Sequence, residues 1–300
     1  MKKIIYLLLA LPLFAASCSN DEVAISEETV EVTFRAAVPC DMPTRAGVAD
    51  LNVDKVVCVV YEGNDEVTTM REVKSIAADG SISFSPRLIR GHAYDVVFWA
   101  MKEGAYNVTN MQAITRNPGL DEVYYDAFTA TTQIVVESSH STQNITLSRP
   151  LAKLNLGVTP DDWNGVADAN TFGMTPKTIT LKVEGKETFN ALIGMATGST
   201  TTLTYNLTVS GEVFTCEGND YKNIAMCYVP AEAAKGVTNL TFSLYDQDGD
   251  AIRQDAPIIN VPLQRNYVTH VVGGLLTGVI TYQIAFENNG EYDGEHPYEI

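Results

Sequence analysis

Short runs of β-forming residues follow one another along most of this chain, and they constrain its fold more than any other feature. They are rich in Val, Ile, Thr, Phe and Tyr, and turn-forming clusters such as EGND, AADG and IRGH separate them. No long segment with a helical apolar period follows the N-terminal leader, and only YNVTNMQAITRN is predicted as a short helix. The pattern predicts an all-β protein built as a β-sandwich. The runs of the first half are VDKVVCVVY, EVTTMREVKSI, SISFSP, AYDVVFWAM, TQIVVE and QNITLS.

A second all-β domain is predicted to begin near SRPLAKLNLGVTP, residues 148–160. The same plan continues there, so we expect one domain over residues 29–149 and another over 150–300. The residues from Glu287 onward are acidic and contain glycine, and they are predicted to form a loosely held tail. The runs of the second half are KTITLKVEG, TTLTYNLTV, NIAMCYVP, TNLTFSLYD, APIINVPL and NYVTHVVGGLLTGVITYQIAF.

The N-terminus has the pattern of a secretion signal. Lys2 and Lys3 precede a short apolar run, and Ala15-Ala16-Ser17 forms a small-residue cleavage site directly before Cys18. This arrangement resembles a bacterial lipobox, although Ala15 stands where leucine is usual. The resemblance implies a signal peptide over residues 1–17, acylation of Cys18 with fatty acids such as palmitate, and an acidic spacer over 18–28. An ordinary signal peptide with a chance cysteine is the alternative.

Residues 30–38 alternate as a half-buried strand does. Val30, Val32, Phe34 and Val38 face one way, with polar residues between them. The following CDMPTRAG contains Pro43 and Gly47 and comes directly after Pro39. Arg45 and Ala46 are therefore predicted to lie on an exposed loop, where proteases cut. Arg35 lies within the strand and should be protected by ladder pairing.

The charge of the chain excludes one class of function. Its formal net charge is -17, and removal of Lys2 and Lys3 with the leader makes it -19. A surface this acidic repels nucleic acid and anionic lipid. Among the cysteines, Cys58 within VVCVVY is predicted to be a buried apolar residue, whereas Cys216 and Cys227 are candidates for a disulfide across a hairpin.

No catalytic or cofactor site is predicted. The four histidines lack metal-ligand spacing, and no nucleophile elbow, P-loop or dinucleotide fingerprint is present. The acidic segment YDQDGD, residues 245–250, fails the EF-hand register and is predicted to be a hairpin turn, with a weak calcium site as the alternative. Trp99 is predicted to lie in the core, whereas Trp163 is predicted to lie on a polar loop. Two roles are open for the Trp163 ring: stacking on a sugar or a partner, or covering the domain junction. Arg71, Arg87, Arg90 and Arg116 are interpreted as solvated charges.

Several segments together resemble the fimbrillin-like proteins of Bacteroidetes, the subunits of type V pili. They are the lipobox with its acidic spacer, VEVTFRAAV followed by the loop TRAG and VDKVVCVVYEG, the junction RPLAKLNLG and the late RNYVTHVVGGLLTG. The resemblance implies two transthyretin-like β-sandwich domains in tandem on a surface-exposed lipoprotein. It also implies that an arginine-specific surface protease cuts after Arg45.

Loss of the first strand would leave unpaired backbone groups and an apolar groove for another subunit to fill. The candidate donor is the segment TGVITYQIAF, residues 277–286, with its alternating apolar positions Val279, Ile280, Tyr282, Ile284 and Phe286. A leaving strand is not expected to be held centrally between two neighbours, and the bond after Arg45 is not expected to be buried; either finding would count against the exchange. If both segments are instead permanent strands, the protein is a monomeric lipoprotein.

The sequence therefore predicts a non-enzymatic fimbrial subunit or pilus-associated lipoprotein of the outer membrane that supports adhesion. Its expected partners are copies of itself or related pilus subunits, the arginine-specific protease, the membrane through its lipid, and a host or glycan receptor. The alternative is a cell-surface lipoprotein that never polymerises and binds a glycan or a partner protein, or a pilus anchor that keeps its lipid.

Overall fold

The computed structural model describes residues 28–38, 52–137, 139–170 and 172–288. Within these ranges almost all regular structure is β, as predicted, and no helix is long and apolar enough to cross a membrane. In the described ranges the one α-helix is α1 (Pro160–Ala167), and the short 3-10 helices are η2 (Thr68–Met70) and η3 (Glu122–Tyr125).

The first half of the molecule contains two large sheets. In one, β1 pairs with β11, β5 and β6; in the other, the strand order is β10-β7-β2-β3, with β4 also paired to β2. A small ladder joins β8 and β9. The strands are β1 (Thr29–Ala37), β2 (Lys55–Glu62), β3 (Asp65–Glu66), β4 (Glu72–Ser75), β5 (Ser81–Phe84), β6 (Arg87–Ile89), β7 (Ala93–Met101), β8 (Tyr106–Asn107), β9 (Thr115–Arg116), β10 (Ala127–Val135) and β11 (Ser141–Thr146).

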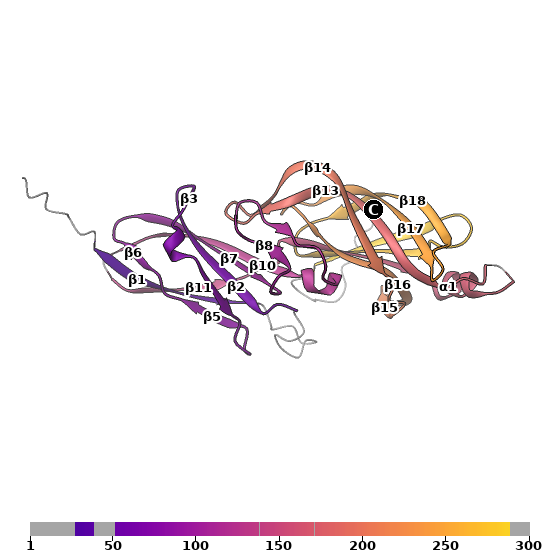
Figure 1. Ribbon diagram of the computed structural model, residues 1–300, viewed down its shortest axis with the longest axis horizontal. Helices are drawn as coiled ribbons and strands as arrows, with labels where there is room; N and C mark the ends of the chain where they lie inside the picture. Colours follow the sequence, from indigo (N-terminus) through magenta and orange to yellow (C-terminus); the bar gives the residue numbers. More distant parts are fainter. Residues whose placement is uncertain (1–27, 39–51, 138, 171, 289–300) are drawn as a thin grey trace, which may run out of the picture.

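The second half also contains two large sheets, with the orders β15-β16-β12-β19-β20 and β14-β13-β17-β18. The two halves follow one another along an elongated molecule, with β1 toward one end and α1 toward the other (Figure 1). The strands are β12 (Leu151–Val158), β13 (Pro176–Asn190), β14 (Met195–Thr208), β15 (Val213–Cys216), β16 (Asn219–Pro230), β17 (Gly236–Asp246), β18 (Ala251–Leu263), β19 (Tyr267–Gly274) and β20 (Thr281–Asn288).

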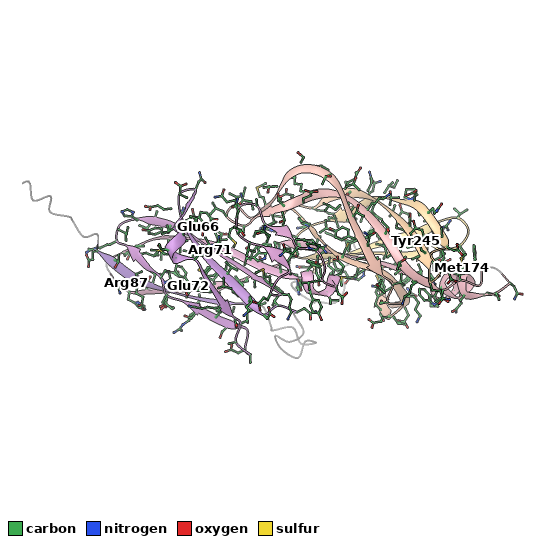
Figure 2. The ribbon with its side chains drawn as sticks, in the orientation of Figure 1. Glu66, Arg71, Glu72, Arg87, Met174 and Tyr245 are labelled. Carbon is green, nitrogen blue, oxygen red and sulfur yellow. The ribbon has the colours of Figure 1, made fainter. Side chains whose placement is uncertain are left out.

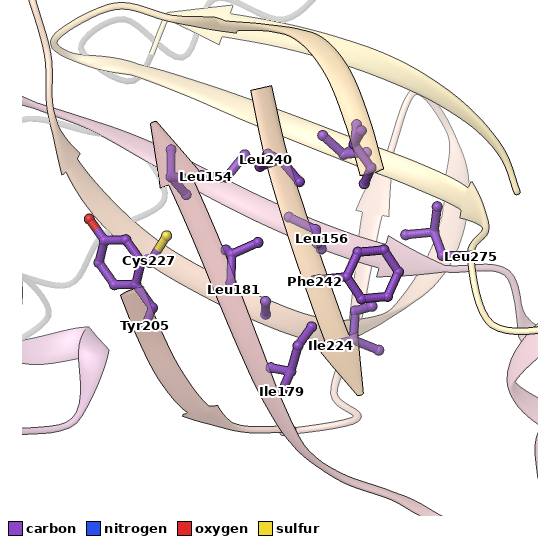
Figure 3. Close-up of a cluster of buried hydrophobic side chains, with 14 of the residues drawn as sticks. Leu154, Leu156, Ile179, Leu181, Tyr205, Ile224, Cys227, Leu240, Phe242 and Leu275 are labelled. Carbon is purple, nitrogen blue, oxygen red and sulfur yellow. The ribbon is translucent and has the colours of Figure 1, made fainter. Parts of the chain in front are cut away.

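Each half has a hydrophobic core between its two sheets. In the first half, Phe34 and Phe84 lie 6.0 and 5.9 Å from Phe98, measured between ring centroids, so aromatic rings from both sheets meet. In the second half, Leu156 and Leu181 contribute to a core drawn from both sheets, which is shown in Figure 3. The period-two strands of the sequence therefore bury one face each, as sandwich strands do.

A third buried cluster joins the two halves. Val57 and Val59 on β2, which point away from the first core, pack in one cluster with Trp99 of β7 and Phe189 of β13. Ile114 and Phe189 exchange backbone hydrogen bonds of 2.9 and 3.0 Å across the junction. Because β2 is covered on both faces, its sequence is continuously apolar rather than alternating.

Two predictions of local structure are wrong. Residues 106–117 do not form a helix; they contain β8, a turn segment and β9. The loop predicted around Trp163 is instead the helix α1. Thr159 caps it by accepting a hydrogen bond from Asp162 N at 3.2 Å, and Pro160 occupies its first turn. Thr-Pro followed by acidic residues is a helix-start signal that identifies such a helix from sequence.

Candidate functional site

The predicted lipidation and processing residues Cys18, Arg45 and Ala46 lie outside the described residues. The two strands predicted to take part in exchange, β1 and β20, are described and form the candidate site.

The faces of β1 are those that the sequence predicted. Val32, Phe34 and Val38 are buried, at most 2% exposed, and Val30 is half-buried. Glu31 and Arg35 are exposed on the opposite face. The strand runs from Thr29 to Ala37 rather than from residue 30 to 38.

The neighbours of β1 contradict the expectation that it is not held centrally. β11 pairs with it in parallel over Val32–Ala37, while β5 and β6 pair with it antiparallel on the other side. Two further backbone bonds, Val32 N to Pro86 O at 3.1 Å and Leu147 N to Ala37 O at 3.0 Å, extend the contacts. The expectation failed because an alternating pattern specifies which face is buried but not how many strands lie alongside.

β1 is the hub of its sheet. Among the described residues, β5, β6 and β11 each pair with β1 and with no other strand. Loss of β1 alone would leave backbone donors and acceptors unpaired on both sides of the resulting gap. A replacing strand must therefore fill a slot with two hydrogen-bonding edges and take up the apolar row of Val32, Phe34 and Val38.

Unlike β1, the predicted donor segment lies on a sheet edge. β20 pairs with β19 alone among the described strands, from Thr281 to Asn288. It begins later than predicted, so Val279 and Ile280 precede it, and Val279 is 86% exposed. Ile280, Tyr282 and Ile284 pack against the second core, whereas Phe286 stacks on Tyr267 with ring centroids 4.7 Å apart.

The loop before β20 is fixed by a residue that the sequence analysis did not single out. Asp162 of α1 is 7% exposed, and its carboxylate accepts backbone hydrogen bonds from Leu275, Leu276 and Thr277 at 2.7, 2.7 and 2.8 Å. Thr277 also donates its hydroxyl at 2.6 Å. Helix α1 thus anchors the chain immediately ahead of the edge strand.

The cysteines do not form the disulfide that was considered. Cys58, Cys216 and Cys227 are free thiols, and all three are buried. Cys216 and Cys227 belong to different clusters, Cys227 to the core between the sheets and Cys216 to a small cluster with Tyr221 and Val272. Cys58 is a core residue, as predicted.

The remaining binding candidates have structural roles. Trp163 is half-buried, packs against the second core and lies over Gly211, so it is not an exposed stacking platform. Asp246 Oδ1 accepts the backbone N–H groups of Asp248 and Asp250, both at 2.9 Å, in the turn between β17 and β18. The prediction of a hairpin turn there is confirmed. Trp99 is fully buried, also as predicted.

Two of the arginines interpreted as solvated are instead packed into the protein. Arg71 forms a bidentate pair with Glu66 at 2.7 Å and donates to the Val108 carbonyl; its place beside Glu66 is visible in Figure 2. Arg116 pairs with Glu122, lies 3.7 Å from the Tyr125 ring centroid and donates to the Tyr228 carbonyl across the junction. Glu66 and Glu122 lie only five and six residues from their arginines, on β3 and η3. The Val108 and Tyr228 carbonyls lie 37 and 112 residues away, and no local pattern predicts those contacts.

One cavity of about 510 Å³ opens beside β13 and the start of β17. Its lining includes buried Val229 and Leu263, exposed Val237, and the polar residues Lys186 and Glu232. Asn239 also lines it. Lys186 Nζ is held by Glu232 at 2.9 Å and by the Ala196 carbonyl at 3.1 Å. The cavity is therefore lined by both apolar and polar residues.

Comparison of the sequence with protein-family models finds one family that matches nearly the whole chain. The model of a family described as of unknown function (DUF6562) matches residues 22–299. The chain belongs to this family. No curated protein matches the sequence.

Solved structures share the fold at low sequence identity. One is a candidate adhesin from Bacteroides thetaiotaomicron, with 12% identity, a TM-score of 0.53, and coverage of 87% of this chain and 97% of that one. A candidate polysaccharide-binding protein from the same species has 12% identity, a TM-score of 0.50, and coverage of 87% and 96%. The fimbrial anchor protein Mfa2 from Porphyromonas gingivalis has 10% identity, a TM-score of 0.48, and coverage of 88% and 98%; at that score it carries no weight. These likenesses concern the fold alone.

Proposed function

We propose that this protein is a non-enzymatic surface lipoprotein that supports adhesion as a pilus subunit or pilus-associated protein. Acylation at Cys18 and cleavage between Arg45 and Ala46 are parts of this proposal. So is the division into two sandwich domains, residues 29–149 and 150–300. The fold shared with a candidate adhesin is consistent with such a role.

The observation that carries the proposal is the arrangement of the first and last strands. A single strand near the N-terminus completes a whole sheet, and an edge strand near the C-terminus has apolar residues on one face. Cleavage after Arg45 would disconnect β1 from the rest of the chain. A neighbour's segment from Val279 to Phe286 would then replace it in the slot.

The central position of β1 changes how this exchange must occur. An edge strand leaves by breaking one ladder, whereas β1 must break ladders on both sides. Release before replacement would expose Phe34's pocket and two strand edges together, which is costly. Exchange is therefore expected to proceed residue by residue, with the incoming strand pairing as β1 peels away.

The N-terminal residue of the protein recovered from bacterial cells tests this proposal. A polymer subunit is expected to begin at Ala46 and to migrate as a ladder of oligomers. A protein that begins at a lipidated Cys18 and is monomeric contradicts processing and exchange. In vitro, an arginine-specific protease should release residues up to Arg45 only when a peptide of residues 278–288 is present to occupy the slot.

A second candidate function is favoured by the central position of β1 and by the cavity beside β13. In this alternative both strands are permanent, and the protein is a lipid-anchored binding module or a pilus anchor that keeps its lipid. The cavity, with its apolar and polar lining residues, is where a saccharide or peptide group would bind. A glycan array tests this function. The wild-type monomer is expected to bind, and the Asn239→Ala variant is expected to lose that binding.

A further inference from the structure

Within the described part of the chain, no further strand pairs with the β14 edge of the β14-β13-β17-β18 sheet. β14 is fourteen residues long and pairs with β13 alone among the described strands. Its sequence, MATGSTTTLTYNLT, contains no proline and no charged residue, although the chain carries a formal net charge of -17. Natural proteins usually protect an edge strand with charges, prolines or bulges, because unpaired backbone groups invite another strand.

The opposite edge of the same sheet has the usual protection. β18 contains Arg253 and Asp255, two prolines at positions 257 and 262, and three register shifts relative to β17. The lack of charges and prolines is therefore specific to the β14 edge and is not shared by the β18 edge of the same sheet. In β14 the one irregularity lies near Gly198, and the register with β13 is unbroken from Thr200 to Thr208.

The ladder with β13 identifies the backbone groups that face outward. Val209 N donates to Lys177 O at 2.9 Å, so this pair is hydrogen-bonded. Hydrogen-bonded and non-hydrogen-bonded pairs alternate in an antiparallel ladder, which directs the N–H and C=O groups of Thr202, Thr204 and Asn206 away from β13. On β13, Glu184 lies opposite Thr202, and its carbonyl accepts from Thr238 on the side away from β14, as the same alternation requires.

We propose that β14 is a self-association surface at which a second copy of this chain adds its own β14 antiparallel. A two-fold axis at Thr204 brings the outward-facing groups of both copies into register. Thr204 then pairs with Thr204, Thr202 with Asn206, and Thr200 with Thr208. The two four-stranded sheets become one continuous sheet across the dimer.

A second copy is the occupant that the composition of β14 fits best. Antiparallel pairing of identical strands brings each residue near the two-fold axis close to its own copy. A charge near Thr204 would therefore face a like charge, and β14 carries none. The Thr and Asn side chains at these positions are exposed on one face, where cross-strand Thr pairs hydrogen-bond. This inference does not depend on processing at Arg45 or on exchange of β1.

Sedimentation velocity over a wide range of protein concentration tests the dimer. The wild-type protein is expected to show a reversible monomer–dimer equilibrium. T204P removes an outward N–H without touching the β13 ladder, and is expected to raise the dimer dissociation constant about tenfold or more. T204A keeps the backbone group and should dimerise as the wild type does.

Cysteine cross-linking tests the register independently of any loss of folding. Opposed residues of a hydrogen-bonded pair have Cα atoms about 5.5 Å apart, within disulfide range. T204C should form a disulfide-linked homodimer on oxidation, whereas T202C should cross-link only to N206C. The proposal is overturned if the wild-type protein stays monomeric or if the T204P protein dimerises as the wild type does. It is also overturned if T202C forms a disulfide-linked homodimer as readily as T204C does.

Discussion

His270 on β19 is the residue through which pH should act most directly on the second half. Its side chain is 12% exposed and stacks on Phe214 with ring centroids 5.4 Å apart, and its Nδ1 lies 3.2 Å from Asn155 Nδ2. Burial lowers the pKa of the His270 imidazole from 6.5 to about 4, and Lys153 acts in the same direction. The folded protein therefore disfavours the imidazolium.

This shift predicts a loss of stability in mild acid. Between the two pKa values the unfolded chain binds the proton and the folded protein does not, so the free energy of unfolding falls as pH falls from 6.5 toward 4. The loss is up to about 3 kcal/mol. Urea unfolding of wild type and His270→Gln across this range measures it, and the variant should lose less stability than the wild type.

A neighbouring carboxyl group, that of Glu287, also titrates in this range, so the effect of His270 must be isolated by comparing wild type with His270→Gln. Glu287 Oε2 lies 3.9 Å from His270 Nε2, and burial, followed by Glu217, raises the pKa of the Glu287 carboxyl. A raised carboxyl pKa opposes the histidine effect, because the folded protein then holds the proton more tightly. His140→Gln, at an exposed position, serves as the control. Equal pH dependence in wild type and His270→Gln would contradict the assignment.

Asp162 gives a second prediction at this scale. Asp162→Asn replaces one acceptor oxygen with a donor that faces N–H groups of the loop at Leu275–Thr277. The free energy of unfolding is expected to fall by about 1–3 kcal/mol, the cost of unsatisfied buried donors. Asp161→Asn, on the exposed neighbour in the same helical turn, should change it little. Faster amide exchange at residues 275–277 in Asp162→Asn alone would locate the effect.

The sequence predicted whether many single residues are buried, but not which residues they contact. Trp99 and Cys58 were placed in the core because their neighbours are apolar, which is local information. Arg116 and Asp162 were misread or overlooked because their contacts lie on Tyr125, Tyr228 and the loop before β20. A buried charge is recognisable only through its partners, and for Arg116 and Asp162 these include Tyr228 and Leu276, which are distant in the sequence.

At the scale of elements, the pattern of β1 specified its faces and left its neighbours open. The alternation from Val30 to Val38 gave the correct buried row. It gave no sign that β11 pairs in parallel from a position more than a hundred residues away, or that β5 and β6 share the other side. Helix α1 was missed for another reason, since eight residues are too few to show a clear period.

The two faces of β1 should respond very differently to substitution. Phe34→Ala removes a fully buried ring that lies 6.0 Å from Phe98, and is expected to lower the free energy of unfolding by about 3–5 kcal/mol. Arg35→Ala, on the exposed face of the same strand, is expected to change it by about 0.5 kcal/mol or less. Chemical denaturation of both variants makes the comparison. A similar loss for both would contradict the assignment of a buried and an exposed face to β1.

At the scale of the whole molecule, the two halves are connected by a buried interface rather than by a linker. β12 continues directly from the first half, with Arg149 just before it paired to Asp126, and both side chains are at most 5% exposed. The interface cluster adds Trp99, Phe189 and Tyr228 from strands of both halves. The sequence placed the boundary near this pair from the segment RPLAKLNLG, but the interface itself depends on the β13–β14 hairpin reaching back to the first half (Figure 1).

Phe189 is where this coupling is best tested. Its ring is 2% exposed and lies 5.7 Å from that of Trp99, so Phe189→Ala opens a cavity in the junction while leaving both sandwich cores complete. Because the halves then share less buried surface, the single calorimetric transition expected of the wild type should separate into two, with an increased maximum dimension in small-angle scattering. Phe172→Ala, at a side chain 45% exposed, should leave one transition. A single unshifted transition in Phe189→Ala would mean that the halves are coupled through the Arg149–Asp126 pair and the backbone bridge instead.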